Sequence, residues 1–497
     1  MAQTTAFLGG AKSRLLPASV PFRFFAAAAA FHLIGWLALG AGAAQVASFR
    51  GGLGWPLAAL HAVTLGVLVM TAIGASVQLL PVATRQPVLS HRLPAGLWWL
   101  YSAAVAVLVA AMAAGQPMPL AVGAAGCGLA LIGWAVLLAR NLLGARGMPV
   151  VVAHGWAALL GLGLLLASGA SLVLMYLGAP AWSRSSAIVL HLAFGAYGFM
   201  GLLMLGFSYI LVPMFALADS PPHRPAIASL VLALAALALA AMAAADMAAA
   251  IVLHLAFGAY GFMGLLVLGF SYILVPMFAL ADSPPHRPAI ASLALALAAL
   301  GLAAMAAADM AAAVVLPAAA IAGAGALALH VRLMRQALRS GLRRQLGRPF
   351  VLVHAGWAGL GASLVAGLAL ALQGPAAAFE RAPALFGALL VLSLLTFLLG
   401  MMARIVPFLA SMHAPAGRRG PPLPSMLAAE RPLALFFHCH LVAVAALLTA
   451  VWFDSAWLVR AAALAGSVGA LAFGVFVGSA WRRMRAGAKP PRVGADL

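Results

Sequence analysis

The sequence predicts an all-α polytopic transmembrane helical bundle, with about fourteen spans and both termini in the cytoplasm. Three observations lead to this prediction. Of the 497 residues, 66% are hydrophobic and only 7% are charged, whereas a soluble protein has about 25% charged residues. Apolar segments of about 20 residues, the length that crosses a bilayer, recur along the chain. Arginines gather in every second connection between these segments, as expected for cytoplasmic loops.

The apolar segments can be taken in order along the chain. A cytoplasmic N-terminal tail (1–20) precedes the helical region (21–480), and a basic cytoplasmic tail (481–497) follows it. The first span is too long for the core of a signal peptide, so we expect it to remain uncleaved in a bacterial-type inner membrane. The predicted spans are 21–48, 56–82, 95–115, 118–141, 149–178, 187–217, 225–246, 249–280, 288–309, 311–331, 349–373, 384–411, 432–452 and 456–480.

The charge balance identifies the partner as lipid rather than nucleic acid. There are 28 Lys and Arg residues against eight Asp and Glu residues, which gives a net charge of +20. Binding of nucleic acid needs a basic face or stripe, but these arginines stand in short blocks between apolar segments. The lipid bilayer is therefore the expected partner. The two cysteines, Cys127 and Cys439, lie in apolar segments and form no CxxC motif.

The middle of the chain contains a tandem repeat. Residues 187–249 recur as 250–312 with three differences, at Met204/Val267, Val231/Ala294 and Ala238/Gly301. This near-identity indicates a recent duplication or an artefact in the assembly of the gene sequence. Each copy holds two predicted spans, so one copy can be removed without inverting the remaining helices. The ancestral protein would then have twelve spans.

An older similarity links three spans that end at the cytoplasmic side. Each has a glycine seven residues before a proline, at Gly74/Pro81, Gly206/Pro213 and Gly400/Pro407. Proline is tolerated near the end of a span where neighbouring groups satisfy the freed carbonyl. The pattern is explained equally well by ordinary helix-end chemistry or by a shared motif.

Histidine is the ionisable residue that enters the predicted spans, since all eight acidic residues lie in loops or at span ends. The absence of buried acids argues against a carrier that couples transport through Asp or Glu. The histidines form two tiers. The outer tier, about five residues inside the outer face, contains His61, His191 and His254, and the inner tier, about as deep from the inner face, contains His154, His354, His438 and His440.

The two tiers indicate metal ligation, although a lone histidine in a membrane is about as often a packing hydrogen-bond donor. Neutral imidazole is an axial ligand of haem iron and also suits copper. Bis-imidazole ligation needs two histidines on facing helices at matching depth. His438 and His440 project about 200° apart on a regular helix, so they would serve different sites, with Cys439 between them as a small apolar residue.

The smaller features around the histidines have simpler explanations. Gly195, Gly198 and Gly201 follow His191 and favour close helix packing, although they would also make room for a flat macrocycle. Arg404 lies near the inner end of its span, where it can extend to the headgroups or pair with a haem propionate.

Two stretches carry a resemblance to known families. The span from His61 to Pro81, with its G-x-x-x-x-L-x-P ending, resembles the second helix of haem–copper oxidase subunit I and of nitric oxide reductase large subunits. The segments VHAGWAGLGASLVAG (353–367) and LLGMMAR (398–404) are similar to the NnrS family. His438 and His440 resemble the two-haem histidine pair of the oxidase superfamily.

The resemblance implies a haem-containing membrane protein, with copper as a further cofactor, connected with respiratory electron transfer or nitric oxide tolerance. His61 would bind the low-spin haem by this similarity. The sequence departs from the oxidases, however, because it has neither an adjacent His-His pair nor a His-x-x-x-Tyr motif, and Ala384 begins the span where a histidine is expected. We therefore expect no oxidase-type copper centre.

Three hypotheses about function remain open at this stage, and enzymatic activity is left undecided. The first is a haem protein that handles respiratory electrons or nitric oxide, in which His61 pairs with His191 or His254 and the inner tier supplies a second site. The second is a transporter or permease without haem, in which His32, halfway through the first span, would matter more. The third is an assembly subunit without a site of its own.

Overall fold

The computed structural model describes most of the chain outside the tandem repeat. Residues 16–195 and 285–486 are described, together with 199, 202–203 and 230, and with interruptions at 47, 50, 85, 87–89, 146–148, 180–183, 308–311, 341–346, 374–381 and 416–421. The predicted span 249–280 with His254, all of the span 225–246 except residue 230, and most of the span 187–217 lie outside the described residues.

The described residues form helices and no strands. Nine of the described helices are long and apolar enough to cross a membrane, so the chain is a multi-pass membrane protein. The principal helices are α2 (Ser19–Ala41), α3 (Trp55–Val63), α4 (Met70–Ala83), α5 (Arg92–Ala114), α6 (Pro117–Leu143), α7 (Pro149–Tyr176), α8 (Arg184–Ala193), α13 (His286–Ala307), α14 (Ala312–Ser340), α15 (Arg348–Gln373), α16 (Ala382–His413), α18 (Glu430–Phe453) and α19 (Ala456–Ala486). Short helical turns are η2 (Ala43–Gln45), η3 (Thr64–Val69) and α17 (Pro424–Leu427).

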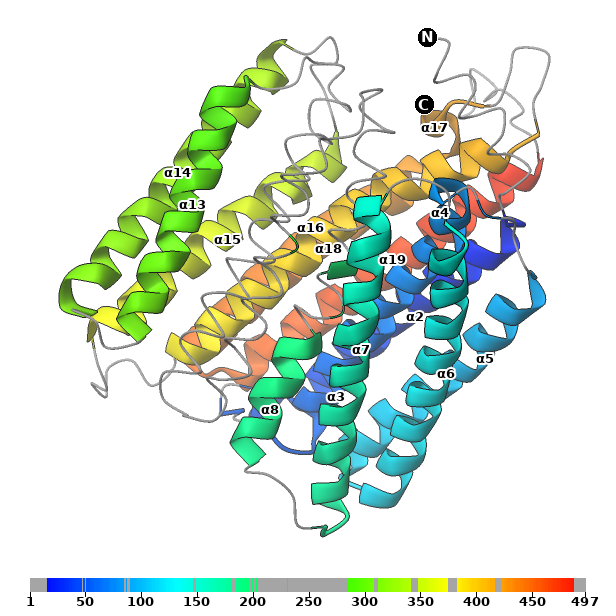
Figure 1. The fold of residues 1–497 in the computed structure, drawn as a ribbon, viewed down its shortest axis with the longest axis horizontal. Coiled ribbons are helices and arrows are strands. Elements are labelled where there is room, and N and C mark those ends of the chain that lie inside the picture. The colour runs from blue at the N-terminus through cyan, green and yellow to red at the C-terminus, as the bar shows by residue number, and fades with distance from the viewer. Residues whose placement is uncertain are drawn as a thin grey trace.

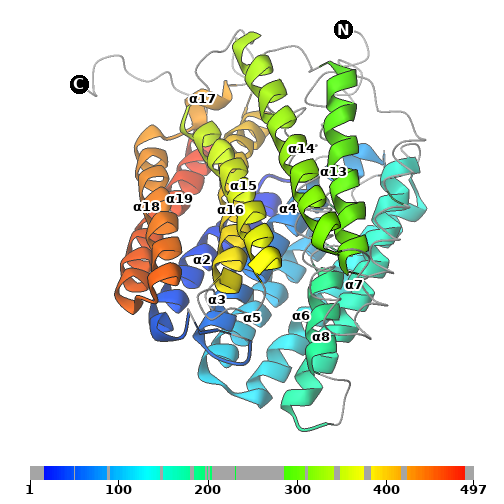
Figure 2. The ribbon, with the colours of Figure 1, turned by 90° about the vertical axis from the view of Figure 1, so that its left-hand side faces the viewer.

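Consecutive helices pack as antiparallel hairpins, which is the usual result of short connections between long helices. The pairs α5/α6, α13/α14, α15/α16 and α18/α19 are in extensive contact. Figure 1 shows α13 and α14 along one edge of the bundle, and Figure 2 shows α15 and α16 between this edge and the α18/α19 pair.

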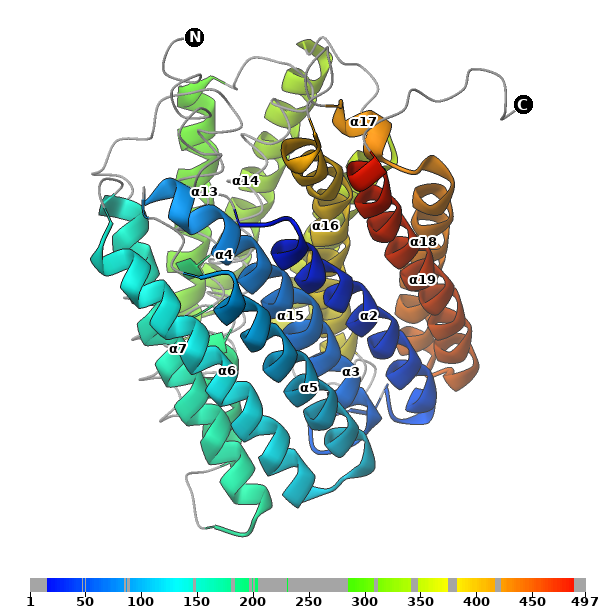
Figure 3. The same cartoon turned by 90° about the vertical axis from the view of Figure 1, so that its right-hand side faces the viewer.

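Helix α2 lies inside the bundle, between α19 on one side and α3, α4 and α5 on the other (Figure 3). Its start lies beside the end of α19, where the rings of Phe22 and Trp481 are 5.1 Å apart. Glycines allow this close packing, because a Cβ atom at Gly66 would collide with the ring of Phe31, and one at Gly74 would lie 2.6 Å from Phe24 Cβ. The absence of side chains at these positions brings α2 against η3 and α4.

The second span changes its winding just after His61. It begins as α3, becomes π-helical through η3, and continues as α4 to Ala83. A π-helical turn widens the helix and displaces backbone carbonyls from their usual partners. One such carbonyl, that of Leu65, accepts a hydrogen bond of 3.2 Å from the Tyr101 hydroxyl on α5. π-helical turns of this kind occur frequently at functional sites.

The glycines that precede proline near the ends of α4 and α16 act as packing positions. A Cβ atom at Gly400 would lie 2.8 Å from the carbonyl oxygen of Pro349, so α16 approaches the backbone of α15 there. Gly74 plays the same part against α2. These contacts support the helix-packing explanation of the shared pattern at the two positions, whereas Gly206 lies outside the described residues.

Three predicted span ends differ from the ends of the helices. The first helix ends at Ala41 rather than at residue 48, because the chain turns at Gly42 and enters η2. Helix α14 continues to Ser340 rather than ending at 331, since arginine, leucine, alanine and glutamine are good helix formers. Similarly, α19 extends into the basic tail as far as Ala486. There Arg483 donates hydrogen bonds to the carbonyl oxygens of Met426 and Ala428.

Candidate functional site

His61 is held on α3 in a defined tautomer. Its Nδ1 lies 3.0 Å from the carbonyl oxygen of Leu57, one turn earlier in the helix. Because a carbonyl only accepts hydrogen bonds, Nδ1 carries the proton and Nε2 keeps its lone pair. The side chain is half-buried. His61 therefore presents a bare Nε2, the usual state of a histidine that ligates a metal.

His191 on α8 is positioned by two neighbouring residues of α7. Its Nδ1 lies 3.5 Å from Ser168 Oγ, and the Ser168 hydroxyl itself donates to the carbonyl of Leu165 at 2.9 Å. The single hydroxyl proton is thus used, so Ser168 accepts from Nδ1–H of His191 and leaves Nε2 with its lone pair. A Cβ atom at Gly169 would lie 3.1 Å from His191 Cε1, so this glycine makes room for the ring.

The two imidazoles, on α3 and α8, are stacked. The centres of the His61 and His191 rings are 6.5 Å apart and their planes are inclined by 22°. Two imidazoles that bind one metal ion end-on, with metal–nitrogen bonds of about 2 Å, have ring centres about 6 Å apart. The hydrogen bonds described for the two rings of this outer pair are made by Nδ1, to Leu57 and to Ser168. The rings are stacked, so it is their separation and their Nδ1 protonation, and not the direction of the Nε2 lone pairs, that suit bis-imidazole ligation.

The backbone around the outer pair is unusual on both sides. η3 begins three residues after His61, and Phe194, three residues after His191, is π-helical as well. Figure 1 shows α8 beside α7, with which it is in contact. Each ligand candidate therefore immediately precedes a widened turn in its own span.

A second pair of facing imidazoles joins α2 to α18. The ring centres of His32 and His440 are 6.3 Å apart, with planes inclined by 57°. Both side chains are 1% exposed, which makes them fully internal. The sequence predicts His440 in an inner tier with His154, His354 and His438, but the structure brings it to His32 instead.

Hydrogen bonds give the two rings of this inner pair different tautomers. Trp36 Nε1–H donates to His32 Nε2 at 3.0 Å, which leaves the ring proton of His32 on Nδ1. Thr396 Oγ1 donates to the carbonyl of Leu392 at 2.6 Å and lies 2.9 Å from His440 Nε2, so it accepts from that nitrogen. His440 therefore keeps its lone pair on Nδ1.

The inner pair of His32 and His440 consequently offers one hydrogen-bond donor and one hydrogen-bond acceptor. His32 Nδ1–H and His440 Nδ1 are both buried, and among the described residues neither has a hydrogen-bond partner. Buried polar atoms are usually satisfied by protein or ordered water. A metal ion would need a lone pair on each ring, so this arrangement suits water or another small polar molecule better than iron.

Glycines of α19 make space for the inner pair. A Cβ atom at Gly466 would collide with the Trp36 indole. One at Gly469 would lie 3.2 Å from Cys439 Cβ and 3.4 Å from the backbone nitrogen of His440. These two positions are three residues apart on one face of α19. They allow α2 and α18 to pack closely against α19 beside His32 and His440.

The remaining histidines of the predicted inner tier are dispersed. His154 is fully buried in α7. His354 is exposed and its Nδ1 donates to the carbonyl of Phe350 at 2.5 Å. His438 is exposed on α18, on a different side from the buried His440, as the 200° separation predicts.

Three buried or hydrogen-bonding residues near the histidines were not predicted from the sequence. His330 on α14 is fully buried and its ring lies 5.6 Å from that of Trp357. Ser168 and Thr396 each accept from a histidine N–H. Single serine and threonine residues are common in membrane helices, so the sequence contains no signal that separates these two from the others.

Within the part of the chain that the structure describes, no three His, Cys, Asp or Glu side chains are grouped to hold a metal ion. Each histidine pair supplies two ligands from the described residues. No protein-family profile matches the chain, and no curated protein matches it.

Proposed function

We propose that this protein binds haem in a bacterial inner membrane and that His61 and His191 are the axial ligands of the iron. The observation that carries the proposal is the matching protonation of the two rings. Each Nδ1 donates within its own surroundings, to Leu57 and to Ser168 respectively, and each Nε2 is left with a lone pair. Such a hydrogen bond on the distal nitrogen fixes the tautomer and the orientation of a metal-bound histidine.

The number of ligands favours haem over a bare metal ion. Haem iron takes four nitrogens from its porphyrin and needs only one or two ligands from the protein. Zinc and copper sites draw three or four ligands from side chains. The outer pair meets the first requirement, with ring centres 6.5 Å apart.

When bound, the haem would supply reversible one-electron chemistry and a site for small diatomic ligands. The protein would hold the iron in its low-spin, six-coordinate form through the two imidazoles, and burial in the bundle would set the potential. The similarity of His61–Pro81 to haem–copper oxidase subunits, and of residues 353–367 to the NnrS family, supports a role in respiratory electron transfer or nitric oxide handling.

The proposal includes the finer topology. Fourteen spans with both termini in the cytoplasm satisfy the arginine distribution along the sequence. The adjacent positions of Phe22 at the start of α2 and Trp481 near the end of α19 support it, because an even number of crossings returns the chain to the same side.

An optical spectrum of the purified protein tests the proposal. After expression in haem-replete cells, the oxidised protein should show a Soret band, and dithionite should sharpen the visible bands as expected for low-spin ferrous haem. The His61→Ala and His191→Ala variants should each lose or shift these bands, whereas His438→Ala, at an exposed position on α18, should not. A colourless wild-type protein would overturn the proposal.

A transporter without haem is the second candidate, and the inner pair is the observation that favours it. His32 and His440 present an unpartnered donor and acceptor inside the bundle, an arrangement that can hold a small polar substrate. Flux of such a substrate into proteoliposomes that contain haem-free protein, abolished by His32→Ala, would favour this candidate.

A further inference from the structure

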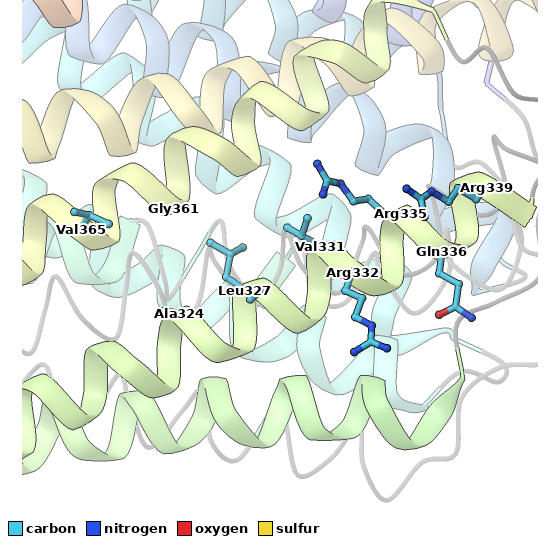
Figure 4. A pocket seen from close by; sticks show the side chains of 10 residues that line it. Ala324, Leu327, Val331, Arg332, Arg335, Gln336, Arg339, Gly361 and Val365 are labelled. Atoms are coloured by element: carbon cyan, nitrogen blue, oxygen red, sulfur yellow. The ribbon is translucent and has the colours of Figure 1, made fainter.

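A cavity of about 1010 Å³ lies between α14 and α15, and neither histidine pair lines it. Its volume is at the upper end of the range for ligand sites, about 300–1,000 Å³. Figure 4 shows Arg332, Arg335 and Arg339 toward one end of the lining, with Arg332 and Arg335 projecting to different sides of α14, and the apolar residues Leu327 and Val365 toward the other end. The cavity is therefore amphipathic along its length.

The α14 wall of the cavity is one face of the helix, which is apolar in its first part and basic in its second part. The apolar part contains Ala324, Leu327, Ala328 and Val331, and the basic part contains Arg332, Arg335, Gln336 and Arg339. Spacings of three and four residues keep these positions on one face of a helix. All three arginines are exposed.

The α15 wall contributes no polar side chain. It is formed by Gly361 and Val365, and a Cβ atom at Gly361 would lie 3.0 Å from Leu327 Cδ2. The glycine thus keeps the two helices close at the apolar end while the space beside it stays open. Val365 is 68% exposed, so an apolar occupant would cover it.

The length of the α14 face that lines the cavity matches the thickness of one leaflet of the bilayer. Fifteen residues separate Ala324 from Arg339 on α14, which at 1.5 Å per residue is about 22 Å. A bilayer with its headgroup regions is about 40–45 Å thick. The basic end therefore falls at headgroup level when the apolar end reaches the middle of the membrane.

The charges at the basic end are not neutralised by either helix. Neither α14 nor α15 contains Asp or Glu. The ion pair found among the described residues joins Arg348 to Glu430, outside this cavity. Guanidinium groups bind phosphate through paired hydrogen bonds, and basic pockets between membrane helices bind anionic headgroups.

We propose that this cavity, formed by α14 and α15, binds one anionic phospholipid, with its phosphate on Arg332, Arg335 and Arg339 and its acyl chains against the apolar stripe. The part of α14 beyond the predicted end of its span carries these arginines. The site does not depend on haem, so its test is independent of the proposed function.

Native mass spectrometry of the delipidated full chain tests this site, with phosphatidylglycerol and phosphatidylcholine of identical acyl chains as probes. The wild type should retain one phosphatidylglycerol molecule. Three arginines near the headgroups favour the anionic lipid by up to about a hundredfold. The triple variant Arg332→Gln/Arg335→Gln/Arg339→Gln should lose at least tenfold of this preference.

Two further variants separate this site from general charge attraction. The control Arg92→Gln/Arg140→Gln/Arg482→Gln removes the same charge from exposed arginines elsewhere and should bind the lipid as the wild type does. Ala328→Phe fills the apolar end without a change in charge and should weaken binding of phosphatidylglycerol at least tenfold.

Three results would overturn the proposal. The first is unchanged binding in the triple arginine variant or in Ala328→Phe. The second is an equal loss in the control variant. The third is displacement of the lipid by inorganic phosphate at comparable concentration, which would identify a site for a free anion.

Discussion

The ring of His61 on α3 lies 6.5 Å from the ring of His191 on α8, and the two planes are inclined by only 22°. The two helices come from distant parts of the chain, yet each histidine donates from Nδ1 and keeps Nε2 bare. Each also precedes a π-helical turn by three residues. This agreement in tautomer, spacing and backbone is the basis for assigning the pair to one iron.

The tandem repeat provides a matched test of the outer pair. His191 and His254 occupy equivalent positions in two copies that differ at only three residues. Because His191 faces His61, His191→Ala should abolish low-spin haem while His254→Ala should retain it. Haem content per protein and the reduced optical spectrum measure the difference. Equal loss of haem in both variants, or loss in His254→Ala alone, would show that the iron is not held by this pair.

Ser168 should act as a positioning residue for His191. Ser168→Ala removes the acceptor for Nδ1–H, and loss of such an outer partner typically lowers metal affinity about 10–100-fold. Transfer of haem to apomyoglobin should become faster in this variant by a similar factor. Ser168→Thr keeps the hydroxyl and serves as the control. A transfer rate in Ser168→Ala equal to that of the wild type would exclude the role.

Thr396 should stabilise the inner pair. Thr396→Val leaves His440 Nε2–H buried without its acceptor, and the expected loss in free energy of unfolding is about 1–2 kcal/mol. Thr449→Val is the matched control, because Thr449 Oγ1 makes the same kind of bond to its own helix at an exposed position. Denaturation in detergent should show a lower midpoint for Thr396→Val alone, with the Soret band unchanged. A shift in the Soret band would mean that the inner pair holds the iron.

Gly466 should tolerate no side chain, because α19 packs against Trp36 there. Gly466→Ala is expected to destabilise the protein by about 1–3 kcal/mol, as overpacking does. Gly478, on the same helix, has open space where a Cβ would be added, so Gly478→Ala should be neutral or stabilising. Thermal unfolding of the two variants in the same detergent compares them. Equal stability would show that α2 and α19 are not packed as described.

The helices were largely predictable from composition, whereas their ends were not. An apolar segment of sufficient length predicts a span, and α5, α6 and α7 lie within a few residues of their predicted ranges. The arginines at the end of α14 ended the predicted span too early. Their charges are unfavourable in lipid, but the helix itself continues to Ser340.

The sequence predicted how deep the candidate histidines lie in their spans, but not which histidines become neighbours. Counting residues from a span end places His61 and His191 at one level, and the structure brings them together. Counting does not reveal which helices are neighbours, and the packing of α2 between α19 and α4 brings His440 to His32. Tautomers depend on Ser168 and Thr396, which approach only after the helices have packed.

Electron paramagnetic resonance of the oxidised protein at low temperature tests bis-imidazole ligation most directly. The wild type should give the signal of low-spin ferric haem with two axial imidazoles. Removing one ligand by His191→Ala should convert it to a high-spin signal. A wild-type sample without a low-spin ferric signal, or a low-spin signal that is the same in wild type and His191→Ala, would contradict the assignment of His61 and His191 to the iron.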